Sequence, residues 1–367
     1  MIAIATQCFG PDFGGIEILM TNLADELARR GQGVDVFADR IRRVGALELA
    51  RPYAIHRFGF WRPLRRIMKR RALQAAAVET PFAGVFTDSW KSVAAIPDGI
   101  GPIAVLAHGN ELPRDIASER AARVRQALGR ARTVVASSRF TADLAQRLIP
   151  DRGTQVIVIN PPLNPQEAAR APALDGLSAA IAGRSPVIST LGRLEPRKGV
   201  DMVLSALPRL RQRFPGIVYL VAGAGDDLSR LRRIAAERGI RDCVVFLGAL
   251  ADEQEKAAFF ERSDVFAMPV RRVAESVEGF GIVYAEAALR GVPSVAGVEG
   301  GAADVVFDGQ TGLLCHGDDE GEVFAALSRL LGDEALRRQL GAAARRHALT
   351  NLTWDSALPR YLAALGL

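Results

Sequence analysis

Short runs of apolar residues alternate with longer amphipathic segments along almost the whole chain. Residues 2–6 form an apolar run of strand length, residues 15–30 repeat apolar positions at helical spacing, and residues 33–38 form a second short run. This order predicts a βαβ unit with parallel strands. Further apolar runs of strand length lie at 84–87, 103–107, 133–136 and 155–159. We therefore expect an α/β fold built around a parallel sheet.

The alternation breaks between residues 160 and 184. This stretch begins with Asn-Pro-Pro and carries further prolines and alanines, which is typical of a linker. A second alternating set follows, with apolar runs at 186–191, 218–222, 243–247, 264–268 and 293–296. With 367 residues, the chain exceeds the size at which a single core usually stops growing. The pattern therefore predicts two successive Rossmann-like units.

Two carboxylates flank a pair of glycines in the segment Glu278-Gly-Phe-Gly-Ile-Val-Tyr-Ala-Glu286. If a helix starts near Phe280 and Gly281, the two carboxylates lie about two turns apart on broadly one face and reach one ligand. Gly279 and Gly281 permit close approach of the backbone, and the N–H groups of a first turn favour an anion such as phosphate. An amphipathic helix with an acidic start explains the same residues, so this segment alone leaves both interpretations open.

A basic loop upstream favours the phosphate-binding interpretation. The apolar run 186–191 leads into a loop that holds Arg193, Arg197 and Lys198, before a helix that we expect to begin near Val200. In an open α/β sheet, ligands bind at the carboxyl ends of the strands. Arginine offers a planar fork to phosphate oxygens, and lysine adds a mobile charge. A solvated basic loop is the alternative explanation.

In these motifs the chain resembles the retaining nucleotide-sugar glycosyltransferases of family 4, which have the two-domain GT-B architecture. The motifs that carry the resemblance are Phe13-Gly-Gly-Ile-Glu17, His108-Gly-Asn-Glu111, the loop 191–199, the segment 278–286, and Gly300-Gly301 before Gly312-Leu-Leu314. The resemblance implies two Rossmann-like domains that face a central cleft. Residues 1–167 would bind the acceptor, residues 168–348 would bind the nucleotide sugar, and residues 349–367 would form a helix that packs back on the first domain, with Trp354 as its anchor.

The resemblance also implies roles for the motif residues. The expected donor-binding residues are Gly14, Gly15, Arg193, Lys198, Glu278, Gly279, Phe280, Gly281 and Glu286. Catalysis would depend on His108, Arg193, Lys198 and Glu278. His108 would contact the donor sugar, the two cations would stabilise the departing diphosphate, and Glu278 would lie near the sugar ring. Glu286 would accept hydrogen bonds from the ribose hydroxyls.

We expect the reaction to need no cofactor and no metal ion. The resembling family does not generally use a divalent ion for transfer, and the basic loop supplies positive charge. The pairs Asp226-Asp227 and Asp318-Asp319 are typical of turns and helix caps. Gly223-Ala-Gly225 lacks the third glycine of a nicotinamide-dinucleotide fingerprint, and the three cysteines have no metal-ligand spacing.

The distribution of charge along the chain indicates one further partner, through a single basic segment. The chain carries a formal net charge of +6, and residues 60–71 hold six basic side chains and no acidic one. Trp61, Leu64, Ile67 and Met68 are interleaved with them. This pattern is typical of a basic amphipathic helix on an anionic membrane surface, and a helix with a solvated basic face would share it. We favour the membrane over a nucleic-acid partner.

The location that we expect is cytoplasmic, with residues 60–71 as a peripheral contact to the inner face of the membrane. The sequence shows no segment long and apolar enough to span a bilayer, and its first residues lack the pattern of a signal peptide.

The sequence therefore predicts a retaining hexosyltransferase that uses a nucleoside-diphosphate sugar and a glycan or lipid-linked acceptor, in the synthesis of a cell-surface polysaccharide or a glycolipid. Two alternatives stay open. One is a GT-B nucleotide-sugar epimerase, which binds the same donor. The other is a non-catalytic GT-B subunit that binds a nucleotide or a partner protein. Residues 270–277 are longer and more charged than we expect before the first glutamate, which leaves the sugar open.

Overall fold

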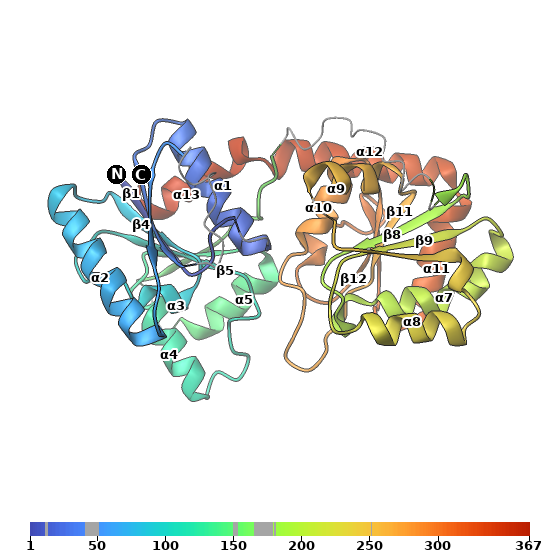
Figure 1. Ribbon diagram of the computed structural model, residues 1–367, viewed down its shortest axis with the longest axis horizontal. Helices are drawn as coiled ribbons and strands as arrows, with labels where there is room; N and C mark the ends of the chain where they lie inside the picture. Colours follow the sequence, from blue (N-terminus) through green and yellow to red (C-terminus); the bar gives the residue numbers. More distant parts are fainter. Residues whose placement is uncertain (12–13, 41–50, 150–152, 165–178, 180, 251) are drawn as a thin grey trace. The chain divides into compact units, whose positions relative to one another are not determined.

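The computed structural model describes the chain except for residues 12–13, 41–50, 150–152, 165–178, 180 and 251. The described residues divide into two compact units, Met1–Pro162 with Trp354–Leu367, and Leu163–Thr353. Figure 1 shows one parallel sheet with its helices in each unit. The predicted boundary between residues 167 and 168 lies outside the described residues. The segment expected to begin at 349 instead continues a helix as far as Asn351.

The first unit is built on a seven-stranded parallel sheet in the order β3-β2-β1-β4-β5-β6-β7. Its strands are β1 (Ile2–Thr6), β2 (Val34–Asp39), β3 (Ala54–Phe58), β4 (Gly84–Thr87), β5 (Ile103–Ala107), β6 (Thr133–Ala136) and β7 (Gln155–Val158). The strand order reverses between β1 and β4. A topological switch point of this kind opens a crevice at the carboxyl ends of the two strands.

Helices cover both faces of this sheet. They are α1 (Gly15–Arg29), α2 (Arg62–Glu79), α3 (Trp90–Val93), α4 (Glu119–Leu128), α5 (Arg139–Leu148) and α13 (Trp354–Leu365). On one face α1 and α13 share a core, in which Trp354 is buried and its ring centroid lies 5.9 Å from that of Tyr361. On the other face, Leu73 of α2 and Val124 of α4 join a second core. The last helix of the chain is therefore an integral part of the first unit.

The second unit has a six-stranded parallel sheet in the order β10-β9-β8-β11-β12-β13. Its strands are β8 (Val187–Leu191), β9 (Val218–Ala222), β10 (Val244–Gly248), β11 (Val265–Met268), β12 (Ser294–Gly297) and β13 (Gly312–Cys315). Its helices are α7 (Val200–Arg213), α8 (Leu228–Glu237), α9 (Glu253–Glu261), α10 (Ile282–Leu289), α11 (Glu320–Gly332) and α12 (Glu334–Asn351). One core gathers residues of α9, α10 and α12, and the opposite core gathers residues of α7, α8 and α11 (Figure 1).

The predicted fold class is confirmed, because both units are parallel α/β sheets covered by helices on both faces. The strands that the sequence pattern missed, β3 and β13, are edge strands. Among the described residues, no helix combines the length and the apolar character that a membrane crossing needs.

Candidate functional site

Gly281 sets the start of the acidic helix. It adopts a left-handed conformation with φ of 81° and caps α10, which begins at Ile282. A Cβ atom at this position would lie 2.6 Å from the ring of Tyr284, so both the backbone angle and the lack of space favour glycine. Glu278 consequently lies before the helix. The helical face that we expected Glu278 and Glu286 to share does not form.

The carboxylate of Glu278 instead accepts two charged hydrogen bonds. Nη1 of Arg197 donates at 2.7 Å, and Nζ of Lys198 donates to the same oxygen. Burial acts to raise the pKa of Glu278, but the positive charges of Lys198 and Arg197 outweigh it and hold the pKa below its ordinary value. Glu278 is therefore a half-buried, ionised group at neutral pH.

The loop after β8 brings both cations to this position. Pro196 opens a 3₁₀ turn, η3 (Pro196–Lys198), and Gly199 follows it in a left-handed conformation with φ of 72°. A Cβ atom at Gly199 would collide with the carbonyl oxygen of Pro269, at the end of β11. The backbone N–H of Arg271 also donates to the carbonyl of Arg197 at 3.0 Å. The loop is thus fixed against the segment that leads to Glu278.

Arg193 lies apart from this pair. Its side chain is 76% exposed, and its Nη1 lies 3.5 Å from the carboxylate of Glu195. Arg197, which the expected donor set did not include, takes the contact with Glu278. A turn that begins at Pro196 places the next two side chains together, and this local signal could have pointed to Arg197.

Glu286 has a different cationic partner. Nζ of Lys256, on α9, donates to its carboxylate at 2.8 Å and lies 2.7 Å from Glu253. Burial raises the pKa of Glu286, and the charge of Lys256 opposes this rise. The side chains of Glu253, Lys256 and Glu286 line a small hollow beside Phe260. In the described part of the chain, the carboxylates of Glu278 and Glu286 share no cation.

Gly279 and Phe280, which lie between Glu278 and Gly281, are both buried. Phe280 is 5% exposed and belongs to the hydrophobic core of the second unit, so its backbone rather than its ring is left to contact a ligand. Gly279 lies in the non-helical segment between Glu278 and Gly281.

His108 directly follows β5 in the first unit, and the sequence pattern had predicted that a strand ends there. Its Nε2 lies 3.0 Å from the backbone oxygen of Asp88, and because a carbonyl can only accept, Nε2 carries the hydrogen. In the neutral ring, Nδ1 then holds the lone pair. The backbone N–H of His108 donates to the carboxylate of Glu111 at 2.6 Å, so the motif fixes its own loop.

Gly14 and Gly15 lie at the carboxyl edge of the same sheet. Gly14 is extended and Gly15 is the first residue of α1. A Cβ atom at Gly14 would collide with the carboxylate of Glu17, whereas one at Gly15 would meet open space. Phe13, which precedes them in the motif, lies outside the described residues. The buried carboxylate of Asp88 accepts from the N–H of Gln7 at 3.1 Å and so joins this edge to the strand end beside His108.

The arrangement therefore places Lys198, Arg197, Glu278 and the start of α10 together in the second unit, and the glycine pair with His108 along one edge of the first. Anion-binding groups and an ionised carboxylate side by side are suited to a phosphate next to a centre that gains positive charge. No group of three or more metal-ligating side chains occurs among the residues that the structure describes.

Comparisons with known proteins identify the same two units. Residues 178–347 match the family described as glycosyl transferases group 1, and residues 13–167 match glycosyltransferase family 4. A GDP-mannose-dependent alpha-(1-6)-phosphatidylinositol monomannoside mannosyltransferase from Mycobacterium tuberculosis is 30% identical, over 97% of this chain and 95% of its own.

A protein of the same name from Mycolicibacterium smegmatis is 43% identical over 47% of this chain, an alignment that spans 45% of that relative. Among solved structures, sucrose-phosphate synthase from Thermosynechococcus elongatus is similar with a TM-score of 0.78 and 22% identity, over 99% of both chains. At this identity the similarity is one of fold.

Proposed function

Since the chain belongs to glycosyltransferase family 4, we propose that it is a retaining hexosyltransferase that moves mannose from GDP-mannose to a lipid acceptor of the phosphatidylinositol mannoside type. The family and the GT-B fold, both predicted from the sequence, are confirmed. The name of the relative from Mycobacterium tuberculosis, which aligns over nearly the full length of both chains, supports the donor and the acceptor.

The contact of Glu278 with Lys198 and Arg197 is the observation that carries this proposal. When the bond between the sugar and the diphosphate breaks, negative charge grows on the phosphate and positive charge grows on the ring. A bound diphosphate would accept the hydrogen bonds of Lys198 and Arg197 in place of Glu278. The Glu278 carboxylate would then be free to face the sugar ring. Both charges of the transition state would then meet an opposite charge in a site poor in water.

The remaining site residues complete the proposed donor site. Arg193, exposed beside the loop, would reach the diphosphate, and the first turn of α10 after Gly281 would offer N–H groups to it. Ribose hydroxyls would donate to Glu286. Gly14, Gly15 and His108 would act from the first unit, with the departing phosphate as the base for the acceptor hydroxyl. We propose that this transfer needs no metal ion.

We also propose that α2 docks the first unit on an anionic membrane. Phe60 and Trp61 are 69% and 68% exposed, and Ile67 is 50% exposed. Two of the six cations serve the fold: Nζ of Lys69 is buried and donates to Asp39 at 2.7 Å, and Arg65 lies 3.1 Å from the same carboxylate. The outward-facing cations are Arg62, Arg66, Arg70 and Arg71. An apolar ridge beside such cations suits a membrane interface.

Replacing Trp61 and Ile67 together by serine should weaken binding to vesicles that contain phosphatidylinositol roughly tenfold or more, because both exposed apolar side chains would lose their burial in the lipid. Co-sedimentation measures this. The matched control replaces Val78 and Ile116 by serine, since both are exposed apolar residues of the same unit outside residues 60–71. Equal loss in the two double variants would argue against docking through residues 60–71.

Nucleotide binding tests the proposed donor directly. In a calorimetric comparison of GDP, UDP and ADP, we expect GDP to bind most tightly, without added magnesium, and Arg193→Ala to weaken GDP binding roughly tenfold. A preference for UDP would contradict GDP-mannose as the donor. GDP-mannose that changes its sugar without an acceptor would favour the epimerase, and binding without turnover would favour the non-catalytic subunit.

A further inference from the structure

A second concave site lies in the first unit, on the face of the sheet that α2, α3 and α4 cover. Its volume is about 330 Å³, and its lining comprises Arg66, Trp90, Lys91, Val93, Ala94, Arg123, Gln126, Ala127 and Arg130. Four of these nine side chains are basic and none is acidic. A hollow of this size is at the lower end of the range for small-molecule sites.

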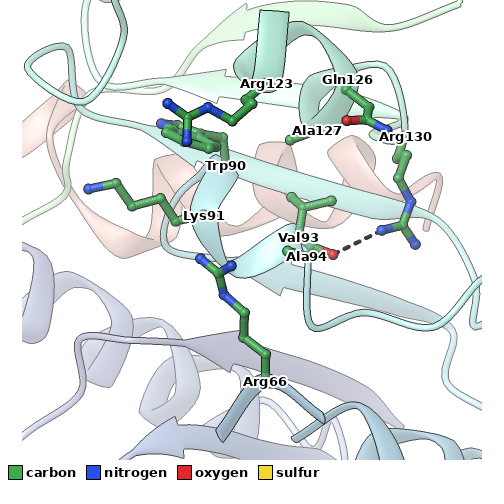
Figure 2. A pocket seen from close by; sticks show the side chains of 9 residues that line it. All are labelled: Arg66, Trp90, Lys91, Val93, Ala94, Arg123, Gln126, Ala127 and Arg130. Atoms are coloured by element: carbon green, nitrogen blue, oxygen red, sulfur yellow. Dashed lines mark hydrogen bonds between the residues drawn. The ribbon is translucent and has the colours of Figure 1, made fainter. Parts of the chain in front are cut away.

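The four cations fall into two groups. Arg130 is committed to the fold, because it donates to the carbonyls of Val93 at 3.0 Å and Ile96 at 2.8 Å and to the carboxylate of Asp98 at 2.8 Å. Figure 2 shows it on one side of the hollow, bonded to Val93. Arg130 therefore shapes the wall.

Arg66, Lys91 and Arg123 form the second group. In Figure 2 they lie on the Trp90 side of the hollow, and they come from three different helices. All three are exposed, and none of them forms an ion pair within the part of the chain that the structure describes. Three uncompensated positive charges around one hollow repel one another, and an anion that bound between them would relieve this repulsion.

Trp90 adds an aromatic surface to this basic hollow. The Nε1–H of the indole donates to the carbonyl of Glu111 at 3.1 Å, which fixes the ring at the start of α3. Its polar edge is thereby satisfied, and the half-buried ring lines the hollow. A fixed aromatic face offers a flat, rigid surface on which the carbon skeleton of a sugar or another polyol can pack. The ligand that fits both features is an anion attached to a polyol.

We propose that this hollow binds a phosphate ester of a small polyol, as carried by a phospholipid headgroup or by a soluble sugar phosphate. Arg123 and Arg66 offer planar forks and Lys91 a point charge to the phosphate, and Trp90 packs against the polyol. The hollow is formed by residues of the first unit alone and shares no residue with the proposed donor site, so it does not depend on the proposed transfer. Arg66 belongs to the same helix as the exposed Ile67, which brings the hollow next to the proposed membrane surface.

One soluble probe and one membrane-bound probe test this site in the intact chain. Calorimetry with glycerol 3-phosphate should show binding, and the double variant Lys91→Gln with Arg123→Gln should weaken it roughly tenfold. The control replaces Arg132 and Arg147 by glutamine, which removes the same charge from exposed positions of the same unit that do not line the hollow. Unchanged melting temperature and GDP binding verify folding, and Lys91→Gln alone serves as a milder variant.

Vesicles of phosphatidylcholine with and without phosphatidylinositol separate the two sources of the phosphate. The double variant Lys91→Gln with Arg123→Gln is called the hollow variant. If it loses more phosphatidylinositol-dependent binding than the control does, the site binds a lipid headgroup, whether or not glycerol 3-phosphate binds. Binding of glycerol 3-phosphate that depends on the hollow, with equal vesicle binding in both variants, assigns it to a soluble phosphate ester. The proposal is overturned if the wild-type chain binds neither probe, or if the hollow variant and its control behave alike with both.

Discussion

Lys198→Met should lower kcat for mannosyl transfer about 100- to 1000-fold at saturating GDP-mannose. The ammonium group of Lys198 lies at the end of β8 beside Glu278, where the account places the departing diphosphate. Methionine keeps much of the buried stem and removes the charge, so packing changes little. The lost stabilisation is greatest in the transition state, because negative charge on the phosphate is greatest there.

Initial rates with labelled GDP-mannose and a mannosylated phosphatidylinositol acceptor measure this effect. Arg346→Met serves as the control, since Arg346 is an exposed cation on α12 of the same unit. We expect its rates to equal those of the wild type. A Lys198→Met variant with unchanged kcat and a raised KM would mean that Lys198 only holds the donor in the ground state.

The second large effect separates the two glutamates. Glu278→Gln should lower kcat about 100-fold while GDP affinity stays constant or rises, because the substitution frees Lys198 and Arg197 from a competing negative charge. Glu286→Gln should weaken GDP binding roughly tenfold with a smaller effect on kcat, because its carboxylate is the proposed acceptor for the ribose hydroxyls.

Calorimetry with GDP and steady-state kinetics on both variants distinguish these roles. Glu334→Gln is the matched control, since Glu334 is an exposed carboxylate at the start of α12. An equal loss of GDP affinity in the Glu278 and Glu286 variants, with no separate effect on rate, would refute the proposed division.

The sequence pattern predicted the central strands because strands buried on both faces, such as β1 and β9, appear as continuous apolar runs. It missed β3 because this edge strand alternates exposed and half-buried residues, among them His56 and Arg57. The other missed strand, β13, also lies at a sheet edge, and its four residues are largely buried. An edge position gives β3 fewer neighbours, so its sequence carries a weaker hydrophobic signal, whereas the edge strands β7 and β10 kept apolar runs and were predicted.

The candidate site was predictable where its geometry is local. The basic loop and Glu278 were identified from sequence, and the structure brings Lys198 of that loop to Glu278. The choice of Arg197 over Arg193 for this contact depends on the 3₁₀ turn after Pro196 and on the left-handed Gly199. Lys256 was missed because its contact with Glu286 joins α9 to α10 across the fold, and no spacing along the chain signals such a pair.

The most direct test of the central claim is to incubate the intact chain with GDP-mannose and a phosphatidylinositol monomannoside in vesicles, in the presence of a metal chelator. Mass spectrometry of the lipid and nuclear magnetic resonance of its new glycosidic bond give the product and its configuration. The account predicts one added mannose in the α configuration of the donor. A product of inverted configuration, or no transfer from GDP-mannose while GDP binds, would contradict it.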